Sequence, residues 1–480
     1  MPPTPFAPSH ATPFKSTLSS SQQPHTNHSP LPPQAARTIS VADIDATHWR
    51  YHAEGGKNLL LSYDPPAGIE APPFVTAQGA YALRIPKSLP PGSEEVQDDV
   101  DEAERFTQHV IQPLLGDSEV LPHCIRIPIG TDRDRTVIDT LAAAIEIHRP
   151  AARRSDPARI RAESLRCIYA VQDITARSTS ASGGDVLCVE IKPKWGFLPR
   201  IDAIPSTSDN VDIKTRYSRF RMHAVARNPA LTREQFDALY DPLDLYSDDP
   251  ERVRRALDAL WTDWIATRGK TNNLRVFCNG ALVRPDDARA LADAAATLGA
   301  SAGEGVEMLR NNVWTHLVVQ VQRELLRRSL VHDGTQVSVL HRLKRLQAAL
   351  DPWDVEGLAH AWTQHTGSHV LGQLPNDSAA AENITPAAAE LLPLVQPLLD
   401  GAQASNVQQA VQAFLVSASF KDCSLLLRFP RAAEASTWMV DLDRKPATKL
   451  AKMQQTDAEV CAAFRGWLSA QSSAPKPSIS

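Results

Sequence analysis

The sequence predicts an α+β protein, because three stretches of the chain differ in the spacing of their apolar residues. Short apolar strands joined by turns occupy the chain from Trp49 to Phe197. From about Lys214 the apolar residues recur at helical spacing, and strand-like runs return in the last third of the chain. Runs of strands and runs of helices in separate stretches are typical of α+β architecture.

The first stretch predicts a mixed, mostly antiparallel sheet. In YHAEGGKNLLLSYD, two strand-like runs flank a glycine turn at Gly55–Gly56. The acidic run over 93–104 starts a helix that extends toward Val110, and its charges indicate a solvated face. We expect strands at residues 51–53, 59–63, 80–87, 167–175 and within 185–197.

The second stretch predicts amphipathic helices. The segment 250–266 places Val253, Leu257, Leu260 and Trp264 on one helical face. Further helices are expected at 313–330 and 337–350, and a surface loop at 367–386. The returning strands are expected at 413–420, 423–429 and 437–443.

Composition excludes several classes of protein. Hydrophobic residues are 42% and charged residues 22% of the chain, a balance typical of soluble globular proteins. No stretch has the roughly 20 consecutive apolar residues of a membrane helix, so we expect no membrane association. The net charge of -5 and the lack of an interleaved aromatic and basic motif argue against a nucleic-acid partner.

The cysteines and the N-terminal composition indicate the cellular compartment in which the protein is expected. Six Cys without a CxxC pair favour neither a disulfide framework nor a four-cysteine zinc site. With no apolar signal at the N-terminus, we expect an intracellular protein of the nucleus, the cytoplasm or both.

Both ends of the chain are expected to be disordered tails. Residues 1–40 are rich in Pro, Ser and Thr and carry only Lys15 and Arg37 as charges, too little apolar surface for a packed core. This N-terminal tail is either a regulatory segment or an inert leader. Residues 471–480 form the second tail.

Four short stretches combine charged or amide side chains with apolar strands. In EIKPKWG, Glu190, Lys192 and Lys194 alternate and would share one strand face. Two ammonium groups side by side repel unless an anion lies between them. The other stretches are NNLRVF (272–277), SFKDCSLLL (419–427) and VDLDRKPATKLAK (440–452).

Each stretch alone is compatible with a solvated strand end, but together they fit phosphoryl transfer from ATP. That chemistry needs a glycine turn over phosphates, a Lys that holds them, an Asp near the attacking hydroxyl and an Asp for a metal. The chain has no GxxxxGK[ST] loop, no HRD or DFG, no HExxH and no GxSxG. It is therefore neither a P-loop enzyme nor an ordinary protein kinase.

The sequence resembles the inositol-pentakisphosphate 2-kinase family, in a fungal-type form. The resemblance extends from Trp49 to about Arg465, and EIKPKWGFLP together with KDCS is its most specific part. The matching stretches, in family order, are EGGKNLLLSY, LRIPK, PLLG, CVEIKPKWGFLP, SRFRMH, DPLDLYSDD, NNLRVFCNG, LDPWDVEGL, KDCSLLLRF and DLDRKP.

The resemblance implies a two-lobed inositol-phosphate-kinase fold, distantly similar to protein kinases, with an ATP cleft between the lobes. The implied N-terminal lobe is 41–184, and the implied C-terminal lobe, 185–470, holds the inositol-phosphate site. The implied reaction phosphorylates inositol 1,3,4,5,6-pentakisphosphate at its 2-hydroxyl to give inositol hexakisphosphate (phytate). We expect a monomer that uses ATP and Mg²⁺.

The resemblance also implies roles for individual residues. Asp422 would orient or accept the hydroxyl proton, Lys192 would bridge toward the transferred phosphate, and Asp441, with Asp443 as a second contact, would bind the metal. The implied nucleotide-binding residues are Glu54, Gly55, Gly56, Lys57, Asn58, Arg84, Asp173, Glu190 and Lys192. The implied substrate-binding residues are Arg149, Lys194, Arg221, Asn272, Asn273, Arg275, Lys445 and Lys449.

The sequence departs from the family at several points. Plant members carry a Cys/His zinc cluster in the second lobe, whereas this chain has no CxxC, so we expect no structural zinc. Two alternatives remain open: an inositol-phosphate kinase of different position specificity, and an inactive inositol-phosphate-binding scaffold. The absence of PxxxDxKxG weighs against the first, and the presence of Lys192, Asp422 and Asp441 against the second.

Overall fold

A computed structural model provides the structure of the chain. It describes residues 39–55, 58–66, 72–76, 79–88, 100–116, 120–177, 184–301, 303, 305–332, 335–374, 386–431 and 433–473. The turn residues Gly56 and Lys57, residues 1–38 and 474–480 of the expected tails, and the start of the expected acidic helix lie outside the described residues. Ile39, inside the expected N-terminal tail, is buried, and residues 471–473 of the expected C-terminal tail belong to the last helix, α16 (Leu450–Ser473).

An antiparallel sheet forms from the first part of the chain, as expected. Its strands run in the order β1-β2-β4-β6-β5, and the short β3 pairs with β4. In β2, Leu59 and Leu61 alternate with more exposed residues, so one face of the strand is apolar. The strands are β1 (Trp49–Glu54), β2 (Asn58–Tyr63), β3 (Val75–Thr76), β4 (Gly79–Pro86), β5 (Cys124–Pro128) and β6 (Cys167–Gln172).

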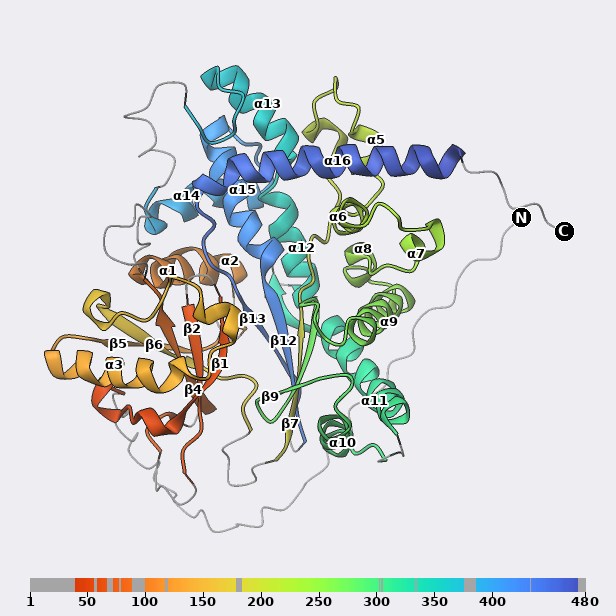
Figure 1. The fold of residues 1–480 in the computed structure, drawn as a ribbon. Coiled ribbons are helices and arrows are strands. Elements are labelled where there is room, and N and C mark those ends of the chain that lie inside the picture. Colours follow the sequence, from red (N-terminus) through yellow and green to blue (C-terminus); the bar gives the residue numbers. More distant parts are fainter. Residues whose placement is uncertain are drawn as a thin grey trace, which may run out of the picture. The chain divides into compact units, whose positions relative to one another are not determined.

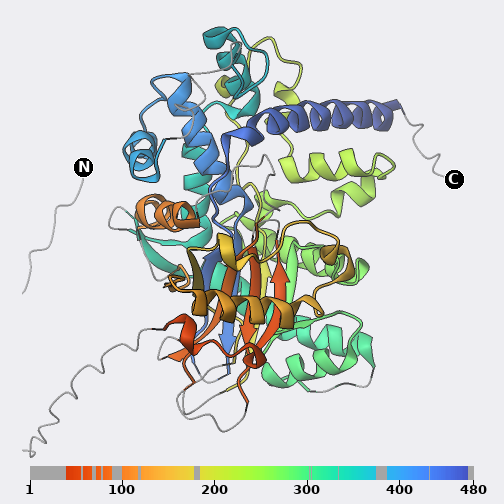
Figure 2. The same ribbon diagram turned by 60° about the vertical axis from the view of Figure 1, so that its left-hand side comes forward.

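The helix α3 (Asp132–Glu146) covers this sheet and lies across its strands in Figure 2. It begins at a capping box, in which the Thr131 hydroxyl accepts from the Asp134 N–H and the Asp134 carboxylate accepts from the Thr131 N–H. Three buried residues at helical spacing, Ile138, Leu141 and Ile145, face the sheet and complete the first apolar core.

A second antiparallel sheet combines strands from the middle and the end of the chain (Figure 1). Its strand order is β13-β12-β7-β8-β9. Every residue of β7 is buried, and the strand pairs with β12 on one side and with β8 on the other. The strands are β7 (Val186–Ile191), β8 (Leu274–Cys278), β9 (Ala281–Val283), β12 (Ser424–Pro430) and β13 (Ser436–Val440). A separate hairpin joins β10 (Arg328–His332) and β11 (Thr335–Ser338).

The amphipathic helices are present where apolar spacing predicted them. α9 spans Pro250–Ala266, and the Asp249 carboxylate accepts from the Glu251 N–H at its start. The predicted helix 313–330 is α11 (Val306–Leu326), but its expected last residues, 328–330, belong to the strand β10. The predicted helix 337–350 is α12 (Val339–Ala349). The other helices are α4 (Ala151–Arg154), α5 (Val211–Lys214), α6 (Arg219–Arg227), α7 (Arg233–Asp237), α8 (Pro242–Leu245), α10 (Ala288–Thr297), α13 (Asp354–Thr366), α14 (Ala388–Leu399) and α16 (Leu450–Ser473).

The strand predicted at 413–420 is wrong, because this segment belongs to the helix α15 (Val407–Asp422). The Asn406 side chain caps the helix by accepting from the Gln409 N–H. From Ala410 to Lys421 every residue is buried, so the helix shows no polar stripe and a short window of it looks like a buried strand. Figure 1 shows α15 leading into β12.

A helical segment from the first part of the chain packs in the core of the second sheet. It comprises α1 (Val100–Phe106), a π-helical turn (Thr107–Ile111) and α2 (Gln112–Leu115). Its buried apolar side chains belong to the same core as β7 and β12. This segment therefore connects the first part of the chain physically to the second sheet. Among the helices of the described residues, none is both long and apolar enough to cross a lipid bilayer.

Candidate active site

Strand pairing brings three predicted site segments to one end of the second sheet. β12 begins at Ser424, which pairs with Val440 at the end of β13, and the next residue, Leu425, pairs with Ile191 at the end of β7. Residues just after β7, just after β13 and just before β12 must therefore be neighbours. Lys192 follows β7 directly, Asp441 follows β13 directly, and Asp422 lies two residues before β12, although the three are far apart in the sequence.

Lys192 and Asp441 form an ion pair, with 2.8 Å between Nζ and Oδ2. The Ser424 hydroxyl lies 3.3 Å from the same Oδ2 and donates to Glu190 Oε1 at 2.8 Å. Loss of hydration favours the neutral form of Asp441, but Lys192 and the Ser424 hydroxyl outweigh it and hold the pKa of Asp441 below its usual value. Asp441 is therefore an ionised carboxylate, and its side chain is 59% exposed.

Asp422 ends α15, and Lys445 Nζ lies 3.0 Å from its Oδ2. Desolvation opposes ionisation of this carboxyl, but Lys445, together with the more distant Lys194 and Lys192, lowers the pKa of Asp422 below its usual value. The carboxylate is thus charged at neutral pH, and the Asp422 side chain is 59% exposed.

Lys194 lies beside this pair in an unusual backbone conformation, with φ of 63°. Desolvation is the main reason that the pKa of Lys194 falls below its ordinary value; Asp422 opposes the shift, and Lys192 adds to it. Two residues later, a Cβ on Gly196 would lie 2.5 Å from the Tyr246 ring, so only glycine fits there.

The structure corrects two expectations about these charges. β7 ends at Ile191 and β13 at Val440, so Lys192, Lys194 and Asp441 lie beyond the strands rather than on a strand face. Repulsion between Lys192 and Lys194 was also expected unless an anion lay between them, but Lys192 is neutralised by the carboxylate of Asp441. Lys445 is paired in the same way with Asp422. Arg275 is paired in the same way, since its Nη1 lies 3.2 Å from Glu190 Oε2.

The neighbouring amide residues lie at the start of β8. The Asn273 carbonyl accepts from the Lys192 N–H at 3.0 Å, which extends the pairing of β7 and β8 by one residue. Asn272 is exposed just before it. Lys449, in the short helical turn Ala447–Lys449, is also exposed.

Arg84 brings the first sheet into contact with this region. Arg84 lies on β4, and its Nη2 is 3.1 Å from Oδ1 of Asp443, three residues beyond β13. A second contact between the sheets stacks His52 of β1 on Phe277 of β8, with 6.2 Å between the ring centroids. The predicted nucleotide contact Arg84 and the predicted metal contact Asp443 are therefore neighbours.

Glu54 and Arg149 lie together in the first part of the chain, in a buried ion-pair network. Arg149 Nε is 3.0 Å from Glu54 Oε2, and the two side chains are 2% and 0% exposed. Lys87 Nζ, also buried, lies 4.0 Å from the same oxygen. In the adjoining turn, the Gly55 N–H donates to the Asn58 carbonyl. In this structure the Glu54 carboxylate therefore binds protein cations.

Two other predicted residues engage structural partners. Arg221 on α6 lies 4.0 Å above the Phe236 ring and 3.4 Å from both Asp237 and Asp241. The Asp173 carboxylate, between β6 and β7, accepts from the N–H and the hydroxyl of Thr175. In these contacts, neither Arg221 nor Asp173 touches Lys192 or Asp441.

Sequence reasoning missed Ser424, whose hydroxyl joins Glu190 to Asp441. The available signal was its position in KDCS, at the start of an apolar run. A buried polar side chain at such a position needs a hydrogen-bond partner.

Oxygen ligands for a hard cation are present beyond β13. Asp441 uses only Oδ2 for Lys192 and Ser424, so Oδ1 is the oxygen not engaged by these contacts. An exposed carboxylate oxygen of this kind fits Mg²⁺.

A separate cluster of three carboxylates, from Asp354, Glu356 and Asp457, surrounds the ammonium group of Lys214 instead of an open metal position. The ammonium nitrogen lies 3.0 Å from Glu356 and 2.7 Å from Asp457.

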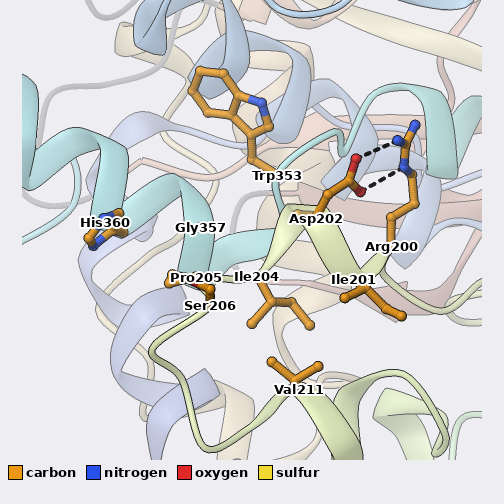
Figure 3. Close-up of a pocket in the computed structure, with 11 residues that line it drawn as sticks. Arg200, Ile201, Asp202, Ile204, Pro205, Ser206, Val211, Trp353, Gly357 and His360 are labelled. Atoms are coloured by element: carbon orange, nitrogen blue, oxygen red, sulfur yellow. Dashed lines mark hydrogen bonds and ion pairs between the residues drawn. The ribbon is translucent and has the colours of Figure 1, made fainter.

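A groove of about 960 Å³ lies elsewhere, between residues 200–211 and α13. Figure 3 shows Ile204, Val211 and Trp353 on its walls and the Arg200–Asp202 ion pair near its edge. None of the residues that line this groove was predicted to bind nucleotide or substrate.

Comparisons with known proteins identify the family of the chain. A family model described as inositol-pentakisphosphate 2-kinase matches residues 51–459. The inositol-pentakisphosphate 2-kinase of Cryptococcus neoformans is 30% identical over 453 residues, which cover 89% of this chain and 95% of that protein. The protein of the same name from Arabidopsis thaliana is 26% identical over 415 residues, covering 81% and 82%. The one from Danio rerio is 25% identical over 257 residues, covering 51% and 46%. The chain therefore belongs to the inositol-pentakisphosphate 2-kinase family.

Proposed function

We propose that this protein transfers the γ-phosphate of ATP to the 2-hydroxyl of inositol 1,3,4,5,6-pentakisphosphate and so produces inositol hexakisphosphate. The observation that carries the proposal is the meeting of Lys192, Lys194, Asp422, Asp441 and Lys445 at one end of the second sheet. We further propose that the two sheets correspond to the two lobes of a distantly protein-kinase-like fold, with ATP between them. The Arg84–Asp443 contact supports this arrangement.

Asp422 is suited to accept the proton of the attacking hydroxyl. Its lowered pKa keeps it ionised at neutral pH, and its exposed side chain is accessible to a substrate. As the 2-hydroxyl oxygen bonds to the γ-phosphorus, the bond from that phosphorus to the bridging oxygen breaks. The proton passes to Asp422, and ADP takes the electron pair of the broken bond.

The paired cations supply charge for a highly anionic substrate. Lys192 would turn from Asp441 toward the transferred phosphate, and Lys445, Arg275 and Lys194 would bind inositol phosphates. In the free protein three of these cations are neutralised by carboxylates, which avoids mutual repulsion. Binding then exchanges a protein carboxylate for a substrate phosphate at each cation, a charge-assisted contact of similar kind.

Asp441 and Asp443 would hold Mg²⁺, and this assignment rests on the chemistry of their oxygen atoms. A bound Mg²⁺ supplies positive charge to the phosphate oxygens of the nucleotide. The Ser424 hydroxyl orients the Asp441 carboxylate for this purpose, and the Arg84 contact positions Asp443.

The direct test incubates the purified protein with ATP, Mg²⁺ and the pentakisphosphate and resolves the product by ion-exchange chromatography. Asp422→Asn should lower kcat by about 100-fold or more and leave the KM for the pentakisphosphate nearly unchanged. Asp202→Asn, which removes an exposed carboxylate near the groove, is the matched control and should retain the native rate. A near-native rate for Asp422→Asn would reject its role as the proton acceptor.

Substrate binding and cellular context give further tests. Saturating pentakisphosphate should raise Tm, since a ligand at 100 times its Kd stabilises the native state by about 2.7 kcal/mol; an unchanged Tm would contradict the site.

We also propose a monomer of the nucleus or cytoplasm that does not bind nucleic acid. Sedimentation, imaging of a tagged protein and a DNA- and RNA-binding assay test these points in turn.

A further inference from the structure

Gln347, on α12, has a side-chain amide that is completely buried, with 0% exposure, and hydrogen-bonded at both of its polar atoms. Its Oε1 accepts from the Gly196 N–H at 2.8 Å. Its Nε2 lies 2.9 Å from the Lys194 carbonyl, 3.0 Å from the Phe420 carbonyl and 3.1 Å from the Tyr246 hydroxyl. Carbonyl oxygens can only accept, so these contacts also determine which amide atom is the nitrogen.

The two carbonyls belong to the two segments that carry the proposed chemistry. Lys194 lies in the segment after β7, and Phe420 lies in the last turn of α15, two residues before Asp422. One amide group therefore connects the backbone of the proposed substrate-binding lysine to the helical turn that carries the proposed proton acceptor. The Tyr246 hydroxyl supports the same connection by donating to the Lys194 carbonyl at 3.2 Å.

The conformation of the lysine segment requires such support. Lys194 has a positive φ, which is disfavoured for a residue with a side chain. Gly196 passes so close to the Tyr246 ring that the chain has little freedom to shift on that side. Gln347 hydrogen-bonds the backbone on both sides of Trp195, and its contact with the Phe420 carbonyl joins this strained turn to α15.

A buried glutamine can have a structural role, in which it only satisfies polar groups of the core, or a positioning role, in which it orients residues of the site. The partners of its hydrogen bonds distinguish the two roles. A purely structural Gln347 would stabilise the fold without a special relation to Lys194. We propose, on the basis of the function proposed above, that Gln347 is a positioning residue that aligns Lys194 with Asp422 for transfer to the 2-hydroxyl. It touches neither substrate and acts through the two segments that it joins.

The test compares Gln347→Met with Gln412→Met. Methionine keeps the length of the side chain but removes its hydrogen bonds, and Gln412 is a second buried glutamine, 4% exposed, on α15. Per folded molecule, we expect Gln347→Met to lower kcat for hexakisphosphate formation 10- to 100-fold, in line with the effect of a small misalignment of reacting groups. The KM for ATP should change less than threefold. Gln412→Met should lower Tm to a similar extent and keep kcat within twofold of the native value.

A double-mutant cycle with Lys194→Met distinguishes positioning from loss of stability. If Gln347 acts through Lys194, adding Gln347→Met to Lys194→Met should lower kcat by less than threefold further. A full additional 10-fold loss, or a Gln347→Met kcat within twofold of native, would overturn the inference. If Gln347→Met does not fold, Tyr246→Phe replaces it in the cycle, with an expected three- to tenfold loss of kcat that should also vanish in the Lys194→Met background.

The native protein in the same assay separates the two proposals. If it forms no hexakisphosphate, the proposed function fails, and the inference about Gln347 falls with it. If it forms hexakisphosphate and the variants behave additively, only the role of Gln347 is rejected.

Discussion

Lys421 is a buried cation whose contribution to stability follows from its surroundings. Its Nζ lies 2.5 Å from Asp351 Oδ2, and the two side chains are 2% and 3% exposed. The same ammonium group lies 4.1 Å from the centroid of the Trp195 ring and 4.9 Å from that of Phe414. Lys421→Met leaves the Asp351 carboxylate buried without its partner, and removal of one partner from a buried pair costs about 3–5 kcal/mol.

The assay is urea unfolding of both proteins, followed by tryptophan fluorescence. We expect the free energy of unfolding of Lys421→Met to be lower by about 4 kcal/mol at pH 8, which includes the lost contacts of the ammonium group with the aromatic rings. The double variant Lys421→Met/Asp351→Asn, which removes the isolated charge as well, should recover at least half of the loss. A loss below about 1 kcal/mol for Lys421→Met would refute the reasoning, because it would mean that water reaches Asp351.

The same variant has a predicted pH dependence. Burial raises the pKa of Asp351 and Lys421 opposes the shift, so removal of Lys421 raises it further. A carboxyl group whose folded-state pKa exceeds its unfolded value of about 3.9 favours folding most when protonated. The difference in stability between the native protein and Lys421→Met should therefore shrink as pH falls toward 4 and reach its full size above the folded-state pKa. A difference that grows on acidification would contradict this sign.

Three further predictions concern single contacts. Lys445→Met should raise the pKa of Asp422 in the free protein, so the loss of kcat/KM on acidification should begin at a higher pH than in the native protein; an identical acidic limb would argue against the pair. Gly196→Ala should lower stability by about 1–3 kcal/mol, measured by Tm, because the added Cβ overlaps the Tyr246 ring; an unchanged Tm would mean that the turn can move. Lys214→Met should lower the urea midpoint strongly at pH 8 and less at pH 5, since it leaves three carboxylates together; equal losses at both pH values would show that another cation compensates.

Elements with a clear amphipathic period were predictable from the sequence, and α9 is the best example. Its polar and apolar faces differ, and Asp249 and Pro250 mark its first turn. α15 was not predictable in the same way, because a helix that is buried on all sides has no contrast between its faces. Its cap at Asn406 was the signal that could have corrected the strand prediction.

The residue types of the candidate site were predictable, but their pairing was not. Charged residues beside apolar strands identified Lys192 and Asp441, yet these residues are 249 positions apart in the sequence. Their contact depends on the order of strands in the second sheet, which short-range patterns do not contain. For the same reason, a buried amide such as that of Gln347 looks in the sequence like any polar residue of an amphipathic helix.

The helical segment 100–115 determines whether the two parts of the chain can be expressed as separate fragments. A fragment that starts at residue 185 would keep both β7 and β12 but lack Phe106, Val110, Ile111, Leu114 and Leu115, which are buried in the same apolar core as these strands. Such a fragment would have an apolar hollow at its centre, and its counterpart would carry the missing side chains on a surface facing water. The two halves should consequently aggregate when expressed apart and regain solubility when produced together.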